Sequence, residues 1–146
     1  MSVQLLFVYG TLRRNARSGI HPLLAVYADF VSEGTYQGCL YEIDDYPGVV
    51  PSIDPSERVA GEVYSLRKPD IILPKLDMYE ECGPGFPEPA EYVRRKQEII
   101  LSDNTKRSAW VYLYNRPTEH LARISSGDFL TAQAGQNAAA NADKPN

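Results

Sequence analysis

The stretch from Phe7 to Arg14 (FVYGTLRR) has the residue types needed to hold an anion on a backbone turn. It joins the end of an apolar run to Gly10 and then to two arginines. Glycine lets the backbone approach a ligand closely and adopt φ values that other residues avoid. Successive N–H groups after such a turn can bind a carboxylate or a developing oxyanion. An ordinary N-terminal strand with a glycine turn explains the local pattern equally well.

A second stretch, from Leu76 to Gly85, offers a carboxylate for proton transfer. Glu80 follows a predicted short helix and leads into a loop rich in glycine and proline. The negative end of the helix dipole disfavours the charged form of Glu80, and burial would raise its pKa further. Both effects suit a general base near pH 7. The alternative is that Glu80 and Glu81 are solvated surface carboxylates, which we prefer for Glu81.

A third stretch, AWVYLY, places aromatic residues in alternation. A strand there would carry Trp110, Tyr112 and Tyr114 on one face and Val111 and Leu113 on the other. A tyrosine hydroxyl in such a row can orient a polar ligand. The commoner role is a core aromatic whose hydroxyl has found a partner, and we favour that role here.

Strand signals dominate the elements that would position these groups. The near-continuous apolar run Val3–Tyr9 predicts a strand buried on both faces. Phe30–Ile43 is interrupted by two glycines and predicts either two strands or one bulged strand. Val59–Leu66 alternates as a half-buried strand does, and Tyr92–Leu101 with Ala109–Tyr114 predicts an antiparallel hairpin.

Helical signals are few and short. Pro22–Tyr27 predicts one or two turns, with proline at the first helical position. Asp70–Tyr79 has apolar residues near one face and Asp70 as an N-cap, unless Pro74 marks the start of a shorter helix. Many strands and few helices indicate an α+β domain with a curved sheet or small barrel.

Composition limits the class of protein. The chain has 146 residues, of which 43% are hydrophobic, so we expect one domain over residues 1–130. Residues 131–146 are small and polar without aromatics, which predicts a disordered tail. A net charge of -4 argues against nucleic acid or an anionic membrane as the main partner.

Targeting and metal-binding signals are weak. The chain has no apolar run near the roughly 20 residues that span a bilayer, and its N-terminus does not resemble a signal peptide, so we expect a cytoplasmic protein. The cysteines Cys39 and Cys82 and the histidines His21 and His120 do not have the spacing of metal ligands. We therefore expect no metal site, and we expect both cysteines to be reduced thiols.

Together with two further segments, these stretches resemble the gamma-glutamylcyclotransferase-like superfamily, including its AIG2-like bacterial members. The matching segments lie in the family's order and cover about residues 3 to 129. They are YGTLR at Tyr9–Arg13, LYEIDDYPGVVPS at Leu40–Ser52, LDxxE at Leu76–Glu80, YVRR at Tyr92–Arg95 and WVYLYN at Trp110–Asn115.

The resemblance implies a compact mixed β-barrel with short flanking helices and a reaction without metal or cofactor. The α-amine of a small γ-glutamyl substrate attacks its own γ-carbonyl and releases 5-oxoproline and an amine or amino acid. Glu80 then acts as the acid/base. The binding candidates are the residues of the glycine turn and two further side chains: Tyr9, Gly10, Thr11, Leu12, Arg13 and Tyr114.

One position departs from the family pattern. Glu81 stands where many members have glycine, and either raises the pKa of Glu80 or points to solvent. Two other classes of function stay open, a small-molecule binding or regulatory protein that lost the chemistry and a structural or interaction domain. Glu80 favours the enzyme, because a binding protein has no need of a carboxylate there.

Overall fold

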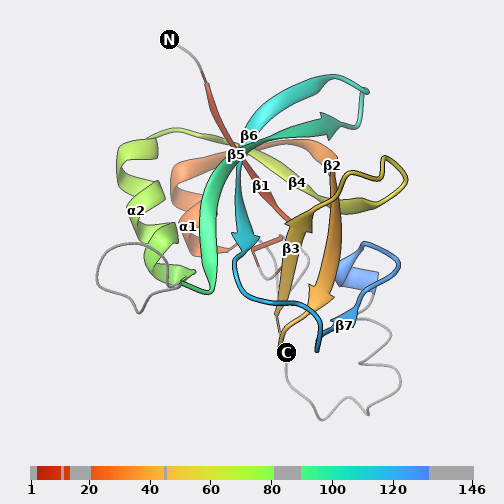
Figure 1. Cartoon of the computed structure of the whole chain (residues 1–146). Coiled ribbons are helices and arrows are strands. Elements are labelled where there is room, and N and C mark those ends of the chain that lie inside the picture. The colour runs from red at the N-terminus through yellow and green to blue at the C-terminus, as the bar shows by residue number, and fades with distance from the viewer. Residues whose placement is uncertain (1–2, 11, 14–20, 45, 81–89, 132–146) are drawn as a thin grey trace.

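The computed structural model of the chain describes residues 3–10, 12–13, 21–44, 46–80 and 90–131, and Figure 1 shows their arrangement. In chain order, the elements are β1 (Gln4–Val8), α1 (Pro22–Tyr27), β2 (Ala28–Glu42), β3 (Pro47–Pro51), β4 (Arg58–Leu66), α2 (Pro69–Tyr79), β5 (Tyr92–Leu101), β6 (Lys106–Tyr114) and β7 (Ala122–Arg123). Strands β2, β4, β1, β6 and β5 close into a barrel, and α1 and α2 lie together against one side of it (Figure 1).

The barrel is mixed because one strand pair is parallel. β1 pairs in parallel with β6 at Leu6 and Trp110, whereas its other neighbour, β4, is antiparallel. The barrel closes where β5 pairs back with β2 and Gly34 lies opposite Leu101. A Cβ at Gly34 would come within 3.0 Å of the Ile100 carbonyl oxygen, so glycine permits this close approach. The predicted mixed β-barrel with short flanking helices is confirmed.

Apolar side chains alternate between two cores, one inside the barrel and one under the helices. On β1, Phe7 packs in the interior and Leu6 packs in the helix-side core. On β6, Val111 packs in the interior and Tyr112 packs in the helix-side core. The prediction of a first strand buried on both faces is therefore confirmed, as is the alternation along AWVYLY.

Most predicted strands are present with small shifts of their ends. β2 is a single strand with an irregularity between Phe30 and Ser32, which is the bulged alternative. β5 and β6 form the predicted antiparallel hairpin, with Tyr92 opposite Tyr114. The sequence did not predict β3 or β7, both of which pair with the C-terminal half of β2.

The start of α2 differs from both predictions. Its N-cap is Lys68, and Asp70 lies in the first turn instead of capping the helix. Pro74 lies inside the helix and costs about 3 kcal/mol, because a proline there removes a backbone hydrogen bond. The helix buries three apolar side chains, and burial of each stabilises the fold by about 1.5–3 kcal/mol: Ile72, Leu73 and Leu76. The stabilisation from their burial therefore exceeds the cost of Pro74.

Two predictions concern parts of the chain that the structure leaves largely undescribed. Residues 132–146, most of the expected disordered tail, lie outside the described residues, and the domain boundary at residue 130 stays a prediction.

None of the described helices is long and apolar enough to cross a membrane.

Candidate active site

The chain turns sharply after β1. The Arg13 backbone N–H donates to the Gly10 carbonyl at 3.0 Å, which closes a tight turn. A Cβ at Gly10 would come within 2.7 Å of Pro47 Cγ, so the turn lies directly against the start of β3. Glycine is needed here because a side chain would collide with Pro47, whereas the sequence analysis expected it to allow close approach of a ligand. Thr11, a predicted binding residue, lies outside the described residues.

Tyr9 anchors the entry to this turn. Its side chain is buried, and its hydroxyl donates to the Tyr112 carbonyl oxygen at 2.5 Å. Burial raises the pKa of the Tyr9 phenol well above its usual range, and the nearby charge of Glu80 raises it further. Tyr9 therefore stays protonated and acts as a fixed hydrogen-bond donor near neutral pH.

Glu80 is the C-cap residue of α2, as the sequence predicted. Its backbone N–H donates to the Leu76 carbonyl at 2.8 Å. The residue is partly exposed, but its carboxyl group is enclosed enough that desolvation is the main cause that raises its pKa, to about 8. The second cause is the like charge of Glu91. A carboxyl group with this pKa can both take and give a proton near neutral pH.

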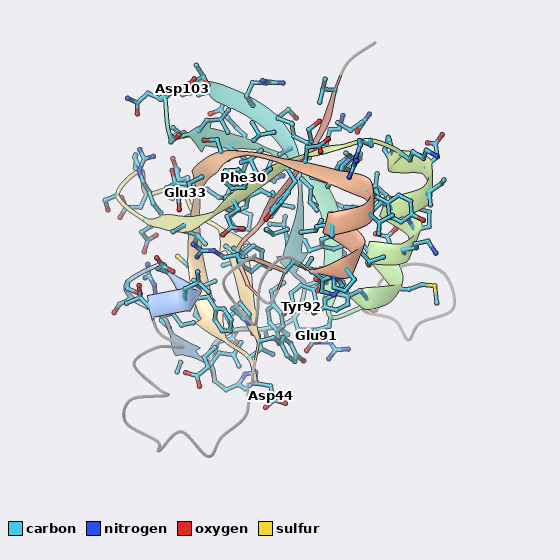
Figure 2. The ribbon with its side chains drawn as sticks, turned by 180° about the vertical axis from the view of Figure 1, so that it is seen from behind. Phe30, Glu33, Asp44, Glu91, Tyr92 and Asp103 are labelled. Atoms are coloured by element: carbon cyan, nitrogen blue, oxygen red, sulfur yellow. The ribbon has the colours of Figure 1, made fainter. Side chains whose placement is uncertain are left out.

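Glu91 is the neighbouring carboxylate that the sequence analysis did not name as a site residue. It precedes β5, and Figure 2 shows it beside Tyr92 at the start of that strand. The Tyr46 hydroxyl donates to its carboxylate at 3.0 Å, and Arg116 Nη1 lies 3.9 Å from Oε2. The only signal in the sequence was an acidic residue directly before a strand. The other acidic candidate, Glu81, lies outside the described residues.

Three tyrosines form a group that contacts Glu91 through the Tyr46 hydroxyl. The ring of Tyr92 meets Tyr114 edge-on at 5.7 Å and lies 6.3 Å from Tyr46. The Tyr92 hydroxyl donates to the Pro47 carbonyl at 2.6 Å. Burial raises the pKa of Tyr92, and the charges that raise it further include Glu80. The charge of Glu80 therefore acts on both Tyr9 and Tyr92, because the end of α2 lies close to the end of β1.

Tyr114, a predicted binding residue, belongs to this tyrosine group. Its ring lies against Gly48, where a Cβ would come within 2.9 Å of Tyr114 Cβ. The YPG segment at Tyr46, Pro47 and Gly48 therefore packs between the glycine turn and Tyr114. The resemblance pointed to this segment, but sequence reasoning gave it no role.

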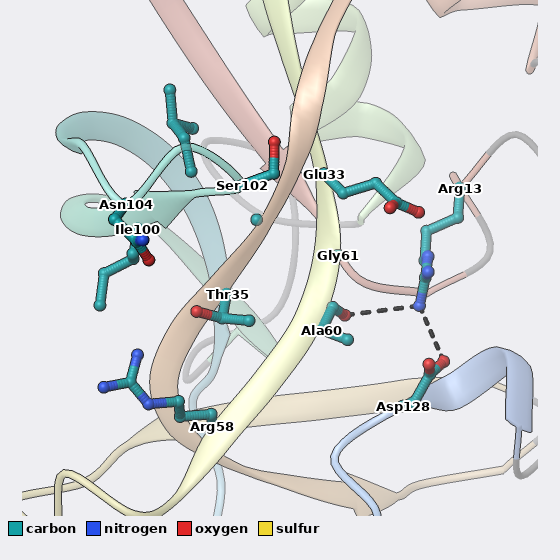
Figure 3. A pocket seen from close by; sticks show the side chains of 12 residues that line it. Arg13, Glu33, Thr35, Arg58, Ala60, Gly61, Ile100, Ser102, Asn104 and Asp128 are labelled. Carbon is teal, nitrogen blue, oxygen red and sulfur yellow. Dashed lines mark hydrogen bonds and ion pairs between the residues drawn. The ribbon is translucent and has the colours of Figure 1, made fainter.

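Leu12 and Arg13 both have buried side chains. Leu12 packs in the helix-side core, in the same cluster as Tyr92 and Tyr114. Arg13 is also buried, and its Nη1 lies 3.0 Å from Asp128 Oδ1 while its Nε lies 3.6 Å from Glu62 Oε2. Figure 3 shows the guanidinium between Asp128 and the Ala60 carbonyl. The Arg13 guanidinium thus has partners within the protein.

Arg13 also lines a pocket of about 490 Å³ between β2, β4 and the β5–β6 turn (Figure 3). Polar residues around this pocket include Glu33, Arg58, Ser102 and Asp128. Glu80, Tyr9 and Tyr114 are absent from its lining, so it is separate from the candidate site. Figure 2 shows Glu33 far from Glu91.

Three of the predicted site residues therefore meet in one region: Glu80, Tyr9 and Tyr114. A carboxyl group with a raised pKa, buried tyrosines and a tight glycine turn can together support proton transfer to a bound polar substrate. Within the described ranges, no three His, Cys, Asp or Glu side chains are grouped to hold a metal ion.

Sequence comparison gives one family match that spans most of the chain. The family model described as "Gamma-glutamyl cyclotransferase, AIG2-like" matches residues 6–131. The Escherichia coli K12 gamma-glutamylcyclotransferase family protein YtfP is 35% identical over 125 residues, which is 86% of this chain and 95% of that protein. A putative gamma-glutamylcyclotransferase of Vibrio cholerae is 31% identical over 128 residues, covering 86% and 94%.

Solved structures have the same fold. The crystal structure of YkqA from Bacillus subtilis superposes with a TM-score of 0.68 at 26% identity, covering 95% of this chain and 43% of that one. The solution structure of ytfP from E. coli gives a TM-score of 0.58 at 29% identity, covering 89% and 99%. An AIG2-like protein from mouse, at 21% identity and a TM-score of 0.63, covers 86% and 88% and is similar in fold.

Proposed function

Because this chain belongs to the AIG2-like gamma-glutamyl cyclotransferase family, we propose that it cyclises the γ-glutamyl group of a small substrate. The α-amine nitrogen attacks the γ-carbonyl carbon and forms the ring C–N bond. The bond between the γ-carbonyl carbon and the leaving nitrogen then breaks. The products are 5-oxoproline and a free amine or amino acid. The reaction consumes no water and needs no oxidant or reductant.

Proton transfer by Glu80 is the step that the site supports best. The attacking α-amine must lose a proton, and the leaving nitrogen must gain one. Glu80 takes the first proton and delivers the second, so one carboxyl group serves both halves of the reaction. Such a transfer contributes about 10²–10⁴-fold in rate. The position of Glu80 supports this proposal: it caps the C-terminus of α2, where burial raises its pKa, and its charge acts on the buried Tyr9 that follows β1.

The turn after β1 is the proposed binding site for the glutamyl group. Backbone N–H groups that follow Gly10, other than that of Arg13, which closes the turn, bind the α-carboxylate or the oxyanion that forms on the γ-carbonyl. One well-placed oxyanion donor contributes about 10²–10³-fold in rate. The Tyr9 hydroxyl donates to the Tyr112 carbonyl and so fixes the residue that precedes the turn. Because of this bond, the hydroxyl is not free to donate to substrate.

Ring closure also benefits from alignment. Attack within one molecule requires only that the site hold the folded conformer of the glutamyl chain. Alignment of this kind removes up to roughly 7–11 kcal/mol from a barrier. The tyrosines Tyr9, Tyr92 and Tyr114 supply fixed apolar surface for that purpose, because two of them donate their hydroxyls to backbone carbonyls.

The test is production of 5-oxoproline from a panel of γ-glutamyl amines and γ-glutamyl amino acids. Wild type should turn over at least one member, and Glu80→Gln should lose at least 10²-fold in kcat. Glu33→Gln is the matched control, because it neutralises an exposed carboxylate in the separate pocket.

Two outcomes contradict the proposal. Equal turnover by wild type and Glu80→Gln removes Glu80 as the acid/base. Binding of γ-glutamyl compounds without any 5-oxoproline from wild type indicates a binding protein instead of an enzyme.

A further inference from the structure

Asp77 lies one helical turn before Glu80 and is tied to the barrel by an arginine. Arg94 of β5 donates from Nε to Oδ1 at 2.8 Å and from Nη2 to Oδ2 at 3.1 Å. Both side chains are 24% exposed. A two-bond contact between guanidinium and carboxylate fixes direction as well as distance, which a single contact does not do. The C-terminal half of α2 is therefore held at a set position on β5.

Tyr112 of β6 is bonded to both sides of the candidate site. Its hydroxyl donates to Asp77 Oδ1 at 2.6 Å, which connects it to the helix that ends at Glu80. Its backbone carbonyl accepts from the Tyr9 hydroxyl at 2.5 Å, which connects it to the glycine turn. One residue of a central barrel strand thus joins the proposed proton carrier and the proposed binding turn.

Arg94 is held in place by the ring of Trp110. Its guanidinium carbon lies 4.5 Å from the centre of the Trp110 ring, a cation–π contact. The indole N–H of Trp110 donates to Gln4 Oε1 at 2.7 Å. Arg94 also lies opposite Tyr112 in the β5–β6 register. The residues that hold Asp77 are therefore supported by three strands of the barrel.

α2 needs such a contact to present Glu80 in one orientation. The helix spans Pro69–Tyr79, has no side-chain bond at its N-cap and contains Pro74. A short helix with these features has little stability of its own, so tertiary contacts must set where its last residue points. Asp77, three residues before Glu80, provides a polar contact from this helix to β5.

We propose that Asp77, Arg94 and Tyr112 form a positioning unit that holds Glu80 at a fixed distance from the turn after β1. The proposal rests on the proposed function, since Glu80 is positioned there for proton transfer. None of the three residues touches the reacting atoms in this assignment. Loss of the unit leaves the binding turn in place but lets the end of α2 move.

The test compares Asp77→Asn, Arg94→Lys and Tyr112→Phe with a matched control. Glu57→Gln is that control, because Glu57 also accepts from one arginine, Arg123, and one hydroxyl, Ser52, but lies on the β3–β4 connection. For Asp77→Asn we expect kcat to fall by about 10²-fold while KM changes less than threefold, since small misplacements of a reacting group cost this much. The kcat of Arg94→Lys should fall less than that of Asp77→Asn, because lysine keeps the positive charge. Glu57→Gln should leave both parameters unchanged.

A second readout does not require activity. The carboxyl ¹³C resonance of Glu80 in labelled protein reports its titration, which we expect at about pH 8 in the wild type. Asp77→Asn should shift that midpoint toward the ordinary value for glutamate, because a mobile Glu80 is better solvated. If no γ-glutamyl compound is turned over by wild type, this titration still tests the positioning unit.

Two results would overturn the proposal. One is a Glu80 titration that is the same in wild type, Asp77→Asn and Tyr112→Phe. The other is a kcat loss in Glu57→Gln equal to that in Asp77→Asn, which would mark a general effect on stability. Should Asp77→Asn not fold, Tyr112→Phe carries the test, because it deletes one hydroxyl and leaves the ion pair between Asp77 and Arg94.

Discussion

The carboxylates of Glu80 and Glu91 lie close enough that the charge of Glu91 raises the pKa of Glu80, second only to the effect of burial. The two residues come from different elements, the end of α2 and the start of β5. Glu91 is held by the Tyr46 hydroxyl and lies near Arg116. The proposed proton carrier thus lies beside a second carboxylate that tunes it.

The pH dependence of activity should follow Glu80. In the free enzyme the carboxylate is the base, so kcat/KM should rise with pH and level off above about 8, the pKa of Glu80. The measurement is initial 5-oxoproline formation between pH 5 and 9.5 at low substrate. Glu33→Gln should give the same profile. A midpoint between pH 4 and 5 would show that Glu80 is solvated in the working enzyme.

Glu91→Gln should move that midpoint downward. Removing the like charge favours the ionised form of Glu80, so its pKa should fall while desolvation keeps it above the ordinary range. Activity at pH 6 should then rise relative to the wild type if the binding site stays intact. Tyr46→Phe separates the charge from the hydrogen bond, because it leaves Glu91 charged. A Glu91→Gln profile that coincides with wild type contradicts the coupling.

The sequence predicts well those features that depend on local pattern. Alternation along Trp110–Tyr114 correctly divided the barrel interior from the helix side, and the run at Val3–Tyr9 correctly predicted a strand buried on both faces. β3 was missed because proline at both ends of Pro47–Pro51 argues locally against a strand, whereas pairing with β2 stabilises it. The parallel pairing of β1 with β6 joins distant segments and leaves no local signal.

The candidate site shows the same limit. The position of Glu80 at a helix end can be predicted from a single segment, and so can the glycine turn. The effect of Glu91 on Glu80 depends on where β5 begins relative to the end of α2, which no local pattern encodes. Arg13 is a second example of this limit. Its place beside the turn in the sequence suggested a contact with a ligand, but the fold brings Glu62 and Asp128 to its guanidinium.

Gly10→Ala should damage the binding turn. The added Cβ would lie 2.7 Å from Pro47 Cγ and 2.8 Å from Pro47 Cδ, so the turn and β3 must move apart. We expect a loss of about 1–3 kcal/mol in stability from the overpacking, and a fall in kcat/KM beyond that of a comparable clash elsewhere. Gly38→Ala is the control, since its Cβ would lie 2.7 Å from the Val50 carbonyl on the β2–β3 pair. Equal activity in the two variants would remove the turn from the site.

Arg13→Met should destabilise the protein without a direct effect on substrate binding. It leaves Glu62, which is 1% exposed, without its buried cation, and breaking such a pair typically costs about 3–5 kcal/mol. Asp128→Asn should cost less, about 1 kcal/mol or below, because the Asp128 side chain is 31% exposed. Urea unfolding measures both. The double variant Arg13→Met/Glu62→Gln should recover part of the loss and keep the wild-type KM. A raised KM in that variant would assign the Arg13 guanidinium to the substrate after all.

Glu80→Gln should also change how stability depends on pH. The pKa of Glu80 is raised in the fold, from 4.5 to about 8, so the folded protein holds this proton more tightly than the unfolded chain. The resulting stabilisation is complete below pH 4.5 and is lost as pH rises through about 8.

Glutamine has no proton to lose, so Glu80→Gln should gain stability relative to wild type between pH 5 and 8. The gain should grow to a few kcal/mol by pH 8, because the pKa rises from 4.5 to about 8 and one pKa unit is worth about 1.4 kcal/mol. Urea unfolding at several pH values gives the difference, with Glu33→Gln as the control for loss of a surface charge. A difference between wild type and Glu80→Gln that stays constant across this range would mean that Glu80 titrates alike in the folded and unfolded chain. The raised pKa on which proton transfer depends would then be absent.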